Sequence, residues 1–308
     1  MSINESTGQA LERERSGRTM KVAQHLFPVK IEECIEMLAR YGGNARIVAG
    51  GTDLFLWLKE GKASAETLVD VSCIKEMKAL EERSDCLILG PGLTHAEVAS
   101  NPVVRRYFPA LSDGCRSVGS PQIRNIGTLG GNIVSAQPAA DSVVPLVALG
   151  AECEIRGLSG SRTELLEELF LGVGKSRVDP TREIITRIIL KKPEGKSGNA
   201  FARIAPREAM ALPVINAAVQ LTVEAGRISA ARIVTAPVAV APFRARKAEE
   251  CLIGKQPGSI GDLKRAAKIA EEEAKPRDSL VRGSGEYRKA LVKDLVEQAL
   301  LRAAGSLG

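Results

Sequence analysis

The chain has 308 residues, more than one hydrophobic core comfortably holds, so its length predicts two domains. Hydrophobic residues make up 44% and charged residues 26%, which is ordinary for a globular protein. Aromatic residues make up only 3% of the chain. The formal net charge is +6, and the Lys and Arg residues are spread along the sequence without a long basic block. This composition argues against a base-stacking platform and against nucleic acid as a partner.

The six cysteines are widely spaced along the chain. No two of them have the C-x-x-C spacing of zinc or iron–sulfur sites, so no metal site is predicted. We expect separate, mostly buried thiols in a cytoplasmic protein. No apolar run is long enough to span a bilayer. Residues 1–20 lack the apolar centre of a secretory signal and are predicted to form a flexible tail.

The first part of the chain predicts a small α/β unit. A helix is indicated by an apolar stripe at i, i+3, i+4 and i+7, formed by Ile31, Cys34, Ile35 and Leu38. Short strands are expected at residues 46–48 and 67–71, and a second helix begins near Leu54.

Strands are next predicted at residues 86–90, 151–156 and 183–190. Thr94 and Glu97 have the spacing of a capping box. Residues 102–118 read as helical or irregular with a break at Pro109, and residues 142–149 as a buried helix.

A polar stretch at residues 191–200 marks the predicted domain boundary. Beyond it the sequence predicts strands, followed by helices near residues 244–253, 260–274 and 284–303. The predicted strands cover residues 201–204, 214–223 and 228–234. Strands followed by helices are typical of an α+β domain.

A first glycine loop, Ala49-Gly50-Gly51-Thr52-Asp53-Leu54, follows the apolar pair Ile47-Val48. Small residues there expose backbone N–H groups that suit a pyrophosphate, and Thr52 adds a hydroxyl donor. Asp53 either caps the next helix or accepts from a ribose or a loop amide. The same residues also form tight turns that bind nothing, and this is not the G-x-G-x-x-G fingerprint.

A second glycine loop, Thr128-Leu129-Gly130-Gly131-Asn132, continues through Ser135 to Asp141. It is read as a loop with free N–H groups. Asp141 stands where a helix should start, so it either caps that helix or accepts from sugar hydroxyls. A purely structural loop and a ligand-binding loop both remain open at this point.

Acid–base machinery is not visible elsewhere. His25 and His95 are the only histidines, and His95 is interpreted as a surface or capping residue. Gly174-Lys175-Ser176 resembles the end of a P-loop, but the required glycine is replaced by Leu169. Because no catalytic side chain can be named, a redox cofactor that supplies the chemistry itself is favoured.

Three stretches carry a family resemblance: IVAGGTDL at residues 47–54, GSPQIRNIGTLGGN at residues 119–132 running on to Asp141, and FARIAPRE at residues 201–208. The chain resembles the FAD-binding medium subunit of molybdenum hydroxylases, the group that includes xanthine dehydrogenase and carbon monoxide dehydrogenase. The similarity runs from residue 21 to the C-terminus.

The resemblance implies an α+β protein with α/β-type subdomains. The expected fold is a vanillyl-alcohol-oxidase-type FAD-binding domain at residues 21–192, with subdomains near 21–78 and 79–192, and a C-terminal α+β domain at residues 193–308. By analogy the cofactor, FAD, would be held by Ile47, Val48, Ala49, Gly50, Gly51, Thr52, Asp53, Leu54, Val118, Thr128, Gly131, Asn132, Ser135, Asp141, Ile185 and Arg203.

Single roles follow by the same analogy. Val118 would lie against the isoalloxazine, and Asp141 would bind ribitol or ribose hydroxyls. Arg203 would place a positive charge near the flavin, where it stabilises the reduced, anionic form. One departure is Ala211, which stands four residues after Arg207 where the family commonly has Asp.

The implied function is electron relay. A large molybdopterin subunit would oxidise the substrate, a small subunit with two-iron two-sulfur clusters would carry the electrons to FAD, and NAD or another acceptor would receive them. Benzoyl-CoA-type members of the family carry a cysteine-bearing insertion for an additional four-iron cluster, and this sequence lacks that insertion. The alternatives are a stand-alone flavin oxidoreductase of the same fold and a non-catalytic scaffold subunit.

Overall fold

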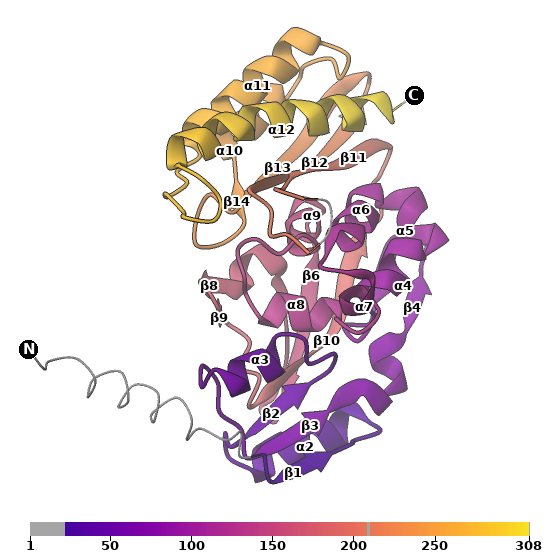
Figure 1. Ribbon diagram of the computed structural model, residues 1–308. Coiled ribbons are helices and arrows are strands. Elements are labelled where there is room, and N and C mark those ends of the chain that lie inside the picture. The colour runs from indigo at the N-terminus through magenta and orange to yellow at the C-terminus, as the bar shows by residue number, and fades with distance from the viewer. Residues whose placement is uncertain (1–21, 208–209, 308) are drawn as a thin grey trace, which may run out of the picture.

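The computed structural model describes residues 22–207 and 210–307, arranged as three sheet units in chain order (Figure 1). The predicted tail at residues 1–20 and Glu208 of the FARIAPRE stretch lie outside these residues. Among the described helices, none combines the length and apolar character needed to cross a membrane. All six cysteines are free, as expected.

The N-terminal unit is a parallel sheet of order β1-β3-β2. Its strands are β1 (Gln24–Leu26), β2 (Ala45–Val48) and β3 (Thr67–Asp70). Helix α2 (Ile31–Arg40) buries the predicted apolar stripe, which confirms that helix. Helix α3 (Leu54–Lys59) follows β2, and two 3-10 turns, η1 (Val71–Cys73) and η2 (Lys75–Lys78), lead out of the unit.

The middle unit is an antiparallel sheet of order β4-β5-β10-β6-β7. Its strands are β4 (Leu80–Glu82), β5 (Cys86–Leu89), β6 (Glu152–Gly157), β7 (Gly160–Leu165) and β10 (Glu183–Lys191). A turn η3 (Leu166–Leu169) and a small ribbon of β8 (Phe170–Gly172) and β9 (Lys175–Ser176) join β7 to β10.

Six short helices accompany this sheet. They are α4 (His95–Ser100), α5 (Pro102–Tyr107), α6 (Pro109–Ser117), α7 (Pro121–Arg124), α8 (Leu129–Val134) and α9 (Val143–Ala148). The predicted capping box is present, since Thr94 Oγ1 accepts from the Glu97 N–H and the Glu97 carboxylate accepts from the Thr94 N–H. Pro109 opens α6, which confirms the break expected there.

The C-terminal unit is an antiparallel sheet of order β11-β12-β13-β14. Its strands are β11 (Lys196–Ile204), β12 (Ile215–Glu224), β13 (Arg227–Ala236) and β14 (Phe243–Arg244). Helices α10 (Arg246–Leu252), α11 (Ile260–Glu273) and α12 (Gly285–Gly305) form a layer with one another, and α10 and α12 pack on the sheet (Figure 1).

Strand β11 begins at Lys196, inside the stretch expected to be a polar linker. It pairs with β12 in continuous register from Lys196 opposite Val223 to Ile204 opposite Ile215. Gly198 is needed there because a Cβ would lie 2.0 Å from the Ala303 carbonyl oxygen of α12. Tertiary pairing therefore overrides the loop-like composition of this segment.

Helices α6 and α9 of the middle unit pack on the C-terminal sheet, so the two units share a core. Asn199 of β11 ties them together: its Oδ1 accepts from the Ala110 N–H at 2.9 Å, and its Nδ2 donates to the Tyr107 carbonyl at 2.9 Å. Phe108, at the N-cap position of α6, supplies no side-chain cap. Asn199 therefore satisfies an N-terminal donor of α6 from another part of the chain.

We expect Asn199→Ala to lower the free energy of unfolding by about 3 kcal/mol, because it leaves a buried N–H and a buried carbonyl without partners. Urea unfolding followed by circular dichroism measures the loss. Ser229→Ala is the matched control, since its exposed hydroxyl makes one long bond of 3.3 Å to the Thr222 carbonyl. Equal stability losses in the two variants would contradict the role of Asn199.

Candidate functional site

The first glycine loop connects β2 to α3 and carries a row of free donors. Among the described residues, none accepts a hydrogen bond from the backbone N–H groups of Gly50, Gly51, Thr52 or Asp53. Gly51 has a positive φ of 68°, which lets successive N–H groups face a common side. Such a row next to the start of a helix suits an anion.

Gly50 brings this loop against the second one. A Cβ at Gly50 would lie 2.1 Å from the Ile126 carbonyl oxygen, a separation that no side chain can adopt. Glycine is therefore required there for contact between the loops. The requirement for glycine at position 50 thus comes from the Ile126 backbone and does not depend on a ligand.

The second glycine stretch differs from the predicted loop, because Leu129–Val134 form helix α8 with Thr128 as its N-cap. Thr128 Oγ1 accepts from the Gly131 N–H at 3.2 Å, and the Gly130 N–H donates to the Pro91 carbonyl at 2.8 Å. Most of its amides are thus used within the protein. Polar side chains remain: Asn132 Oδ1 accepts from Ser142 Oγ at 2.7 Å, which leaves the Asn132 NH2 group as a donor.

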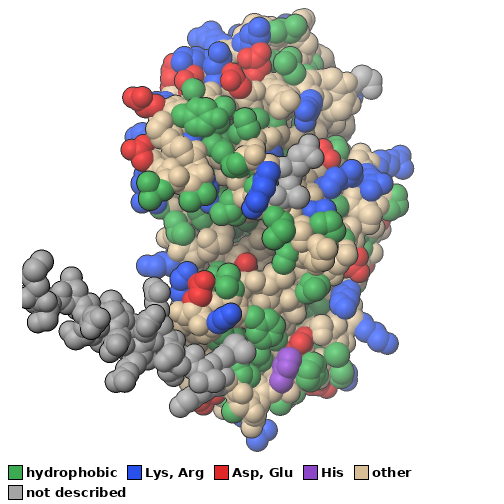
Figure 2. All heavy atoms as spheres, viewed as in Figure 1, with side chains coloured by type: hydrophobic (Ala, Val, Ile, Leu, Met, Phe, Trp, Pro, Cys, Tyr) green, Lys and Arg blue, Asp and Glu red, His purple; other side chains and the backbone are tan. Residues whose placement is uncertain are grey.

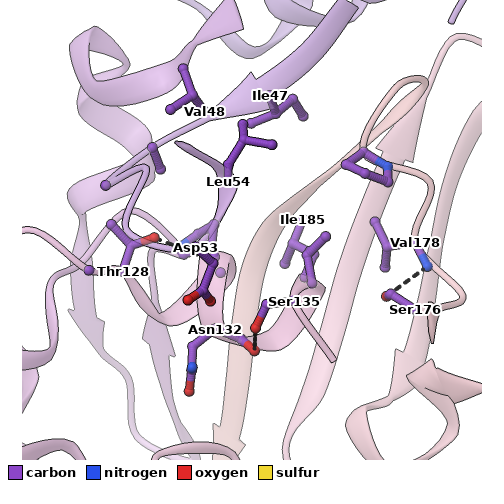
Figure 3. Close-up of a pocket in the computed structure, with 18 of the residues that line it drawn as sticks. Ile47, Val48, Asp53, Leu54, Thr128, Asn132, Ser135, Ser176, Val178 and Ile185 are labelled. Carbon is purple, nitrogen blue, oxygen red and sulfur yellow. Dashed lines mark hydrogen bonds between the residues drawn. The ribbon is translucent and has the colours of Figure 1, made fainter. Parts of the chain in front are cut away.

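A cavity of about 700 Å³ lies between the two stretches, and we call it the loop cavity (Figure 3). The structure brings fourteen predicted residues to it: Ile47, Val48, Ala49, Gly50, Gly51, Thr52, Asp53, Leu54, Val118, Thr128, Gly131, Asn132, Ser135 and Ile185. The close-up shows Ile185 on β10 facing the loop residues across this space. The cavity therefore combines an amide-lined side with apolar walls.

Part of the wall of the loop cavity that faces the first glycine loop could not be predicted from the sequence. Ser176 and Val178 line the cavity from the segment around β9 (Figure 3). Ile184 lines it from β10. The Ile47 N–H donates to the Pro180 carbonyl at 3.2 Å, which fixes this segment beside the first loop. No local pattern marks these residues, because their place depends on the pairing of β10 with the middle sheet.

Asp53 lies where the loop cavity meets a second cavity. It occupies the N-cap position of α3 but its side chain makes no cap hydrogen bond. Burial raises the pKa of its carboxyl, and a hydrogen bond with Ser135 opposes that rise. The Asp53 carboxylate therefore does not cap α3.

His95 corrects a sequence interpretation. It was expected at the surface or as a cap, but it is 2% exposed and lines the loop cavity. The cap is Thr94, and pairing of Thr94 with Thr128 draws the next residue inward. Its Nδ1 is buried and has no hydrogen-bond partner in the part of the chain that the structure describes, and burial lowers the pKa of His95 to about 4. A neutral ring with an unmatched nitrogen fits a wall that a polar ligand completes.

Asp141 and Arg203 are not brought into the loop cavity. Asp141 Oδ2 accepts from Arg203 Nε at 3.1 Å, and Asp141 Oδ1 accepts from Asn216 Nδ2 at 2.7 Å. Arg203 also donates to the Ala211 carbonyl. Burial raises the pKa of Asp141 to about 6, although Arg203 lowers it. Asp141 lines the second cavity, and the N-cap of α9 is Ser142.

The site is suited to binding a ligand that has an anionic centre, which would face the amide row, and apolar groups on either side of that centre. In the described ranges, no three His, Cys, Asp or Glu side chains are grouped so that they could hold a metal ion. A dinucleotide cofactor has this combination of a charged centre and planar ends.

Comparison with known proteins agrees with this geometry. Residues 20–193 match the FAD binding domain in molybdopterin dehydrogenase, and residues 200–303 match the CO dehydrogenase flavoprotein C-terminal domain. The nicotine 6-hydroxylase medium subunit of Paenarthrobacter nicotinovorans is 30% identical over 91% of this chain and 96% of its own. The nicotinate dehydrogenase FAD-subunit of Eubacterium barkeri is 30% identical over 76% of this chain and 81% of its own.

Solved structures show the same fold. Carbon monoxide dehydrogenase from Hydrogenophaga pseudoflava matches with a TM-score of 0.86 at 26% identity, covering 93% of this chain and 99% of that one. Quinoline 2-oxidoreductase from Pseudomonas putida 86 matches with a TM-score of 0.84 at 27% identity, covering 93% and 98%. The predicted fold class, FAD as the cofactor, and membership in an oxidoreductase family are thereby confirmed. The chain belongs to the family of FAD-binding medium subunits of molybdenum hydroxylases.

Proposed function

We propose that this chain relays electrons: it takes them from two-iron two-sulfur clusters on a small subunit into FAD, and passes them to NAD or another acceptor. The substrate would be oxidised on a separate large subunit that carries molybdopterin. The observation that carries the proposal is the row of four free N–H groups between the two glycine stretches, since such a row suits the pyrophosphate of a cofactor.

The residues present fit the cofactor. The N–H groups from Gly50 to Asp53 would hold the pyrophosphate. Asp53 and the Asn132 NH2 group would bind hydroxyls, and Val118, which lines both cavities, would lie against the ring system. Bound there, FAD would supply one- and two-electron chemistry that amino-acid side chains lack.

His95, Asp141 and Arg203 are poor candidates for substrate chemistry. His95 is neutral and buried, so it has no charge to contribute. The Asp141 carboxylate is hydrogen-bonded at both oxygens, and Arg203 is its partner. The chain's own residues would therefore bind and orient the cofactor and exclude water, which supports a relay subunit over a stand-alone oxidoreductase.

The setting we propose is a cytoplasmic complex of three kinds of subunit. The six free cysteines suit a reducing compartment. Among the relatives, the 6-hydroxypseudooxynicotine dehydrogenase protein of Paenarthrobacter nicotinovorans is named as a subunit of a complex, and carbon monoxide dehydrogenase of Hydrogenophaga pseudoflava has a medium chain. These names support partner subunits for this chain.

Thr52→Asp should weaken FAD binding about 100-fold, because a carboxylate beside the amide row repels the pyrophosphate. Thr52→Asn has the same shape without the charge and should stay within about fivefold of wild type. Fluorescence titration of the apoprotein with FAD measures both dissociation constants. Saturating FAD should also raise the melting temperature of the wild type more than that of Thr52→Asp. Equal affinities in the two variants would show that the pyrophosphate does not lie here.

When it is purified alone and loaded with FAD, the chain should show no activity beyond the reduction of dyes with NADH as the electron donor. It should leave N-heterocycles such as nicotinate and xanthine unchanged. Expressed with its neighbouring reading frames, it should co-purify with molybdopterin and iron–sulfur subunits. Rapid-freeze EPR of that complex should then show the clusters reduced before the flavin. Oxidation of an organic substrate by the isolated chain would favour the stand-alone enzyme, and a chain that cannot be loaded with FAD would favour the scaffold.

A further inference from the structure

A second cavity of about 980 Å³ adjoins the loop cavity, between the middle and C-terminal units. Asp53, Val118, Ile123 and Asn132 line both cavities, so the two form one continuous space. The view in Figure 2 shows the surface hollowed between the C-terminal half above and the middle unit below. A molecule entering this cavity from solvent would approach the proposed ring site at Val118.

One wall of the second cavity is basic. It is made by the segment between α11 and α12 together with the first turn of α12, and its cations are Lys275, Arg277, Arg282 and Arg288. We call these four residues the basic wall. Within residues 22–207 and 210–307, no carboxylate forms an ion pair with any of them. Asp278, which lies among them, uses its Oδ1 to accept from the Gly285 N–H at 2.7 Å, at the start of α12.

Arg288 is a buried charge without a counter-ion. It is 3% exposed and donates only to backbone carbonyls, those of Val214 at 3.4 Å, Arg277 at 2.6 Å and Pro237. Burial and the nearby Arg282 both lower its pKa. Burying an uncompensated charge costs several kcal/mol in general. An anion in the adjoining cavity would supply the missing compensation.

Arg282 is the cation best placed to meet that anion. A tight turn holds it, since Ser279 and Gly283 exchange backbone hydrogen bonds of 3.0 and 2.9 Å and the Arg282 N–H donates to Ser279 Oγ. Leu280 and Val281, at the tip of this turn, are exposed to solvent, whereas Arg282 is half-buried and lines the cavity. Its Nε is buried and has no hydrogen-bond partner among the described residues. A guanidinium with an unmatched donor is suited to a phosphate or carboxylate.

Arg203 does not compete for this role. Its guanidinium is paired with Asp141, so its positive charge is compensated inside the protein. The uncompensated positive charge along the cavity therefore belongs to the basic wall. Since Val118 lines the same cavity, a negatively charged oxidant bound there would share that cavity with the proposed ring site.

We propose that the basic wall binds the phosphate or carboxylate group of a small anionic molecule, and that this molecule is the soluble acceptor of electrons from the flavin. The inference rests on the proposed function and names the class of acceptor. A pyridine nucleotide would leave with one hydride, that is two electrons and one proton, while the second flavin proton passes to solvent. A one-electron anion such as ferricyanide would be consumed at two per flavin, with both protons released to solvent.

The test uses the FAD-loaded protein, reduced under anaerobic conditions and mixed with an oxidant in a stopped-flow instrument. Arg282→Gln should slow reoxidation by ferricyanide, a trianion, about 10- to 100-fold at low ionic strength, which corresponds to losing a charged hydrogen bond. Reoxidation by neutral 1,4-benzoquinone should stay within about twofold. Inorganic pyrophosphate should compete with ferricyanide in the wild type and lose most of its inhibition in the variant.

Three controls separate binding from structure. Arg282→Lys should restore most of the ferricyanide rate, because it returns the charge. Arg265→Gln, at an exposed position on α11, removes the same net charge elsewhere and should leave both rates unchanged. The flavin midpoint potential should also be the same in Arg282→Gln and wild type, because the arginine binds the acceptor and leaves the ring untouched.

Equal slowing with both oxidants, a shifted flavin potential, or unchanged pyrophosphate inhibition in Arg282→Gln would overturn this inference and leave the relay function intact. A wild-type protein that retains no FAD would overturn the proposed function and the inference together. Arg288 is unsuitable as the test position, since its three carbonyl contacts join the β12 and α12 regions and its loss would disturb the fold.

Discussion

The contact between the two glycine stretches is the constraint on which the site depends. Gly50 lies so close to the carbonyl of Ile126 that any side chain would separate the two stretches. That contact places the free N–H groups of residues 50–53 beside the start of α8 and closes the loop cavity from one side. Backbone donors without protein partners are rare in folded chains, and a row of them is stable only where water or a ligand completes their hydrogen bonds.

The two stretches divide the task between them. The first contributes amides, because none of its four central N–H groups is bound to a described residue. The second contributes rigidity, because Thr128 caps α8 and the Gly130 and Leu129 amides reach back to residues 91 and 93. An anion at the amide row would lie beside a helix whose geometry is already fixed by hydrogen bonds within the protein. This arrangement limits the conformational entropy lost on binding.

Sequence patterns predicted what depends on neighbouring residues in the chain. The stripe of α2, the capping box at Thr94 and the strand-to-helix turn at Gly50 are local features, and the structure contains all three. Most predicted cofactor residues also line one cavity, because two short stretches supply them. Asn199 as a cap for α6 could not be predicted, since the residues it joins are 89 positions apart. His95 was missed for the same reason: a strand-like contact between Thr94 and Thr128 buries it.

Arg203 shows why a residue's charge alone does not settle its role. The family resemblance placed a positive charge at this position near the flavin, and the arginine is present. In the folded chain its guanidinium is 3.1 Å from a buried carboxylate that also accepts from Asn216, so the pair joins the middle and C-terminal units and has little field beyond itself. Cations that lack such partners line the second cavity, and they lie 72 to 85 positions further along the chain. Because β11 and β12 carry Arg203 and Asn216 while α12 carries Arg288, the same C-terminal unit both neutralises one charge and presents another. The packing of the C-terminal unit therefore decides which positive charges along the second cavity stay unpaired.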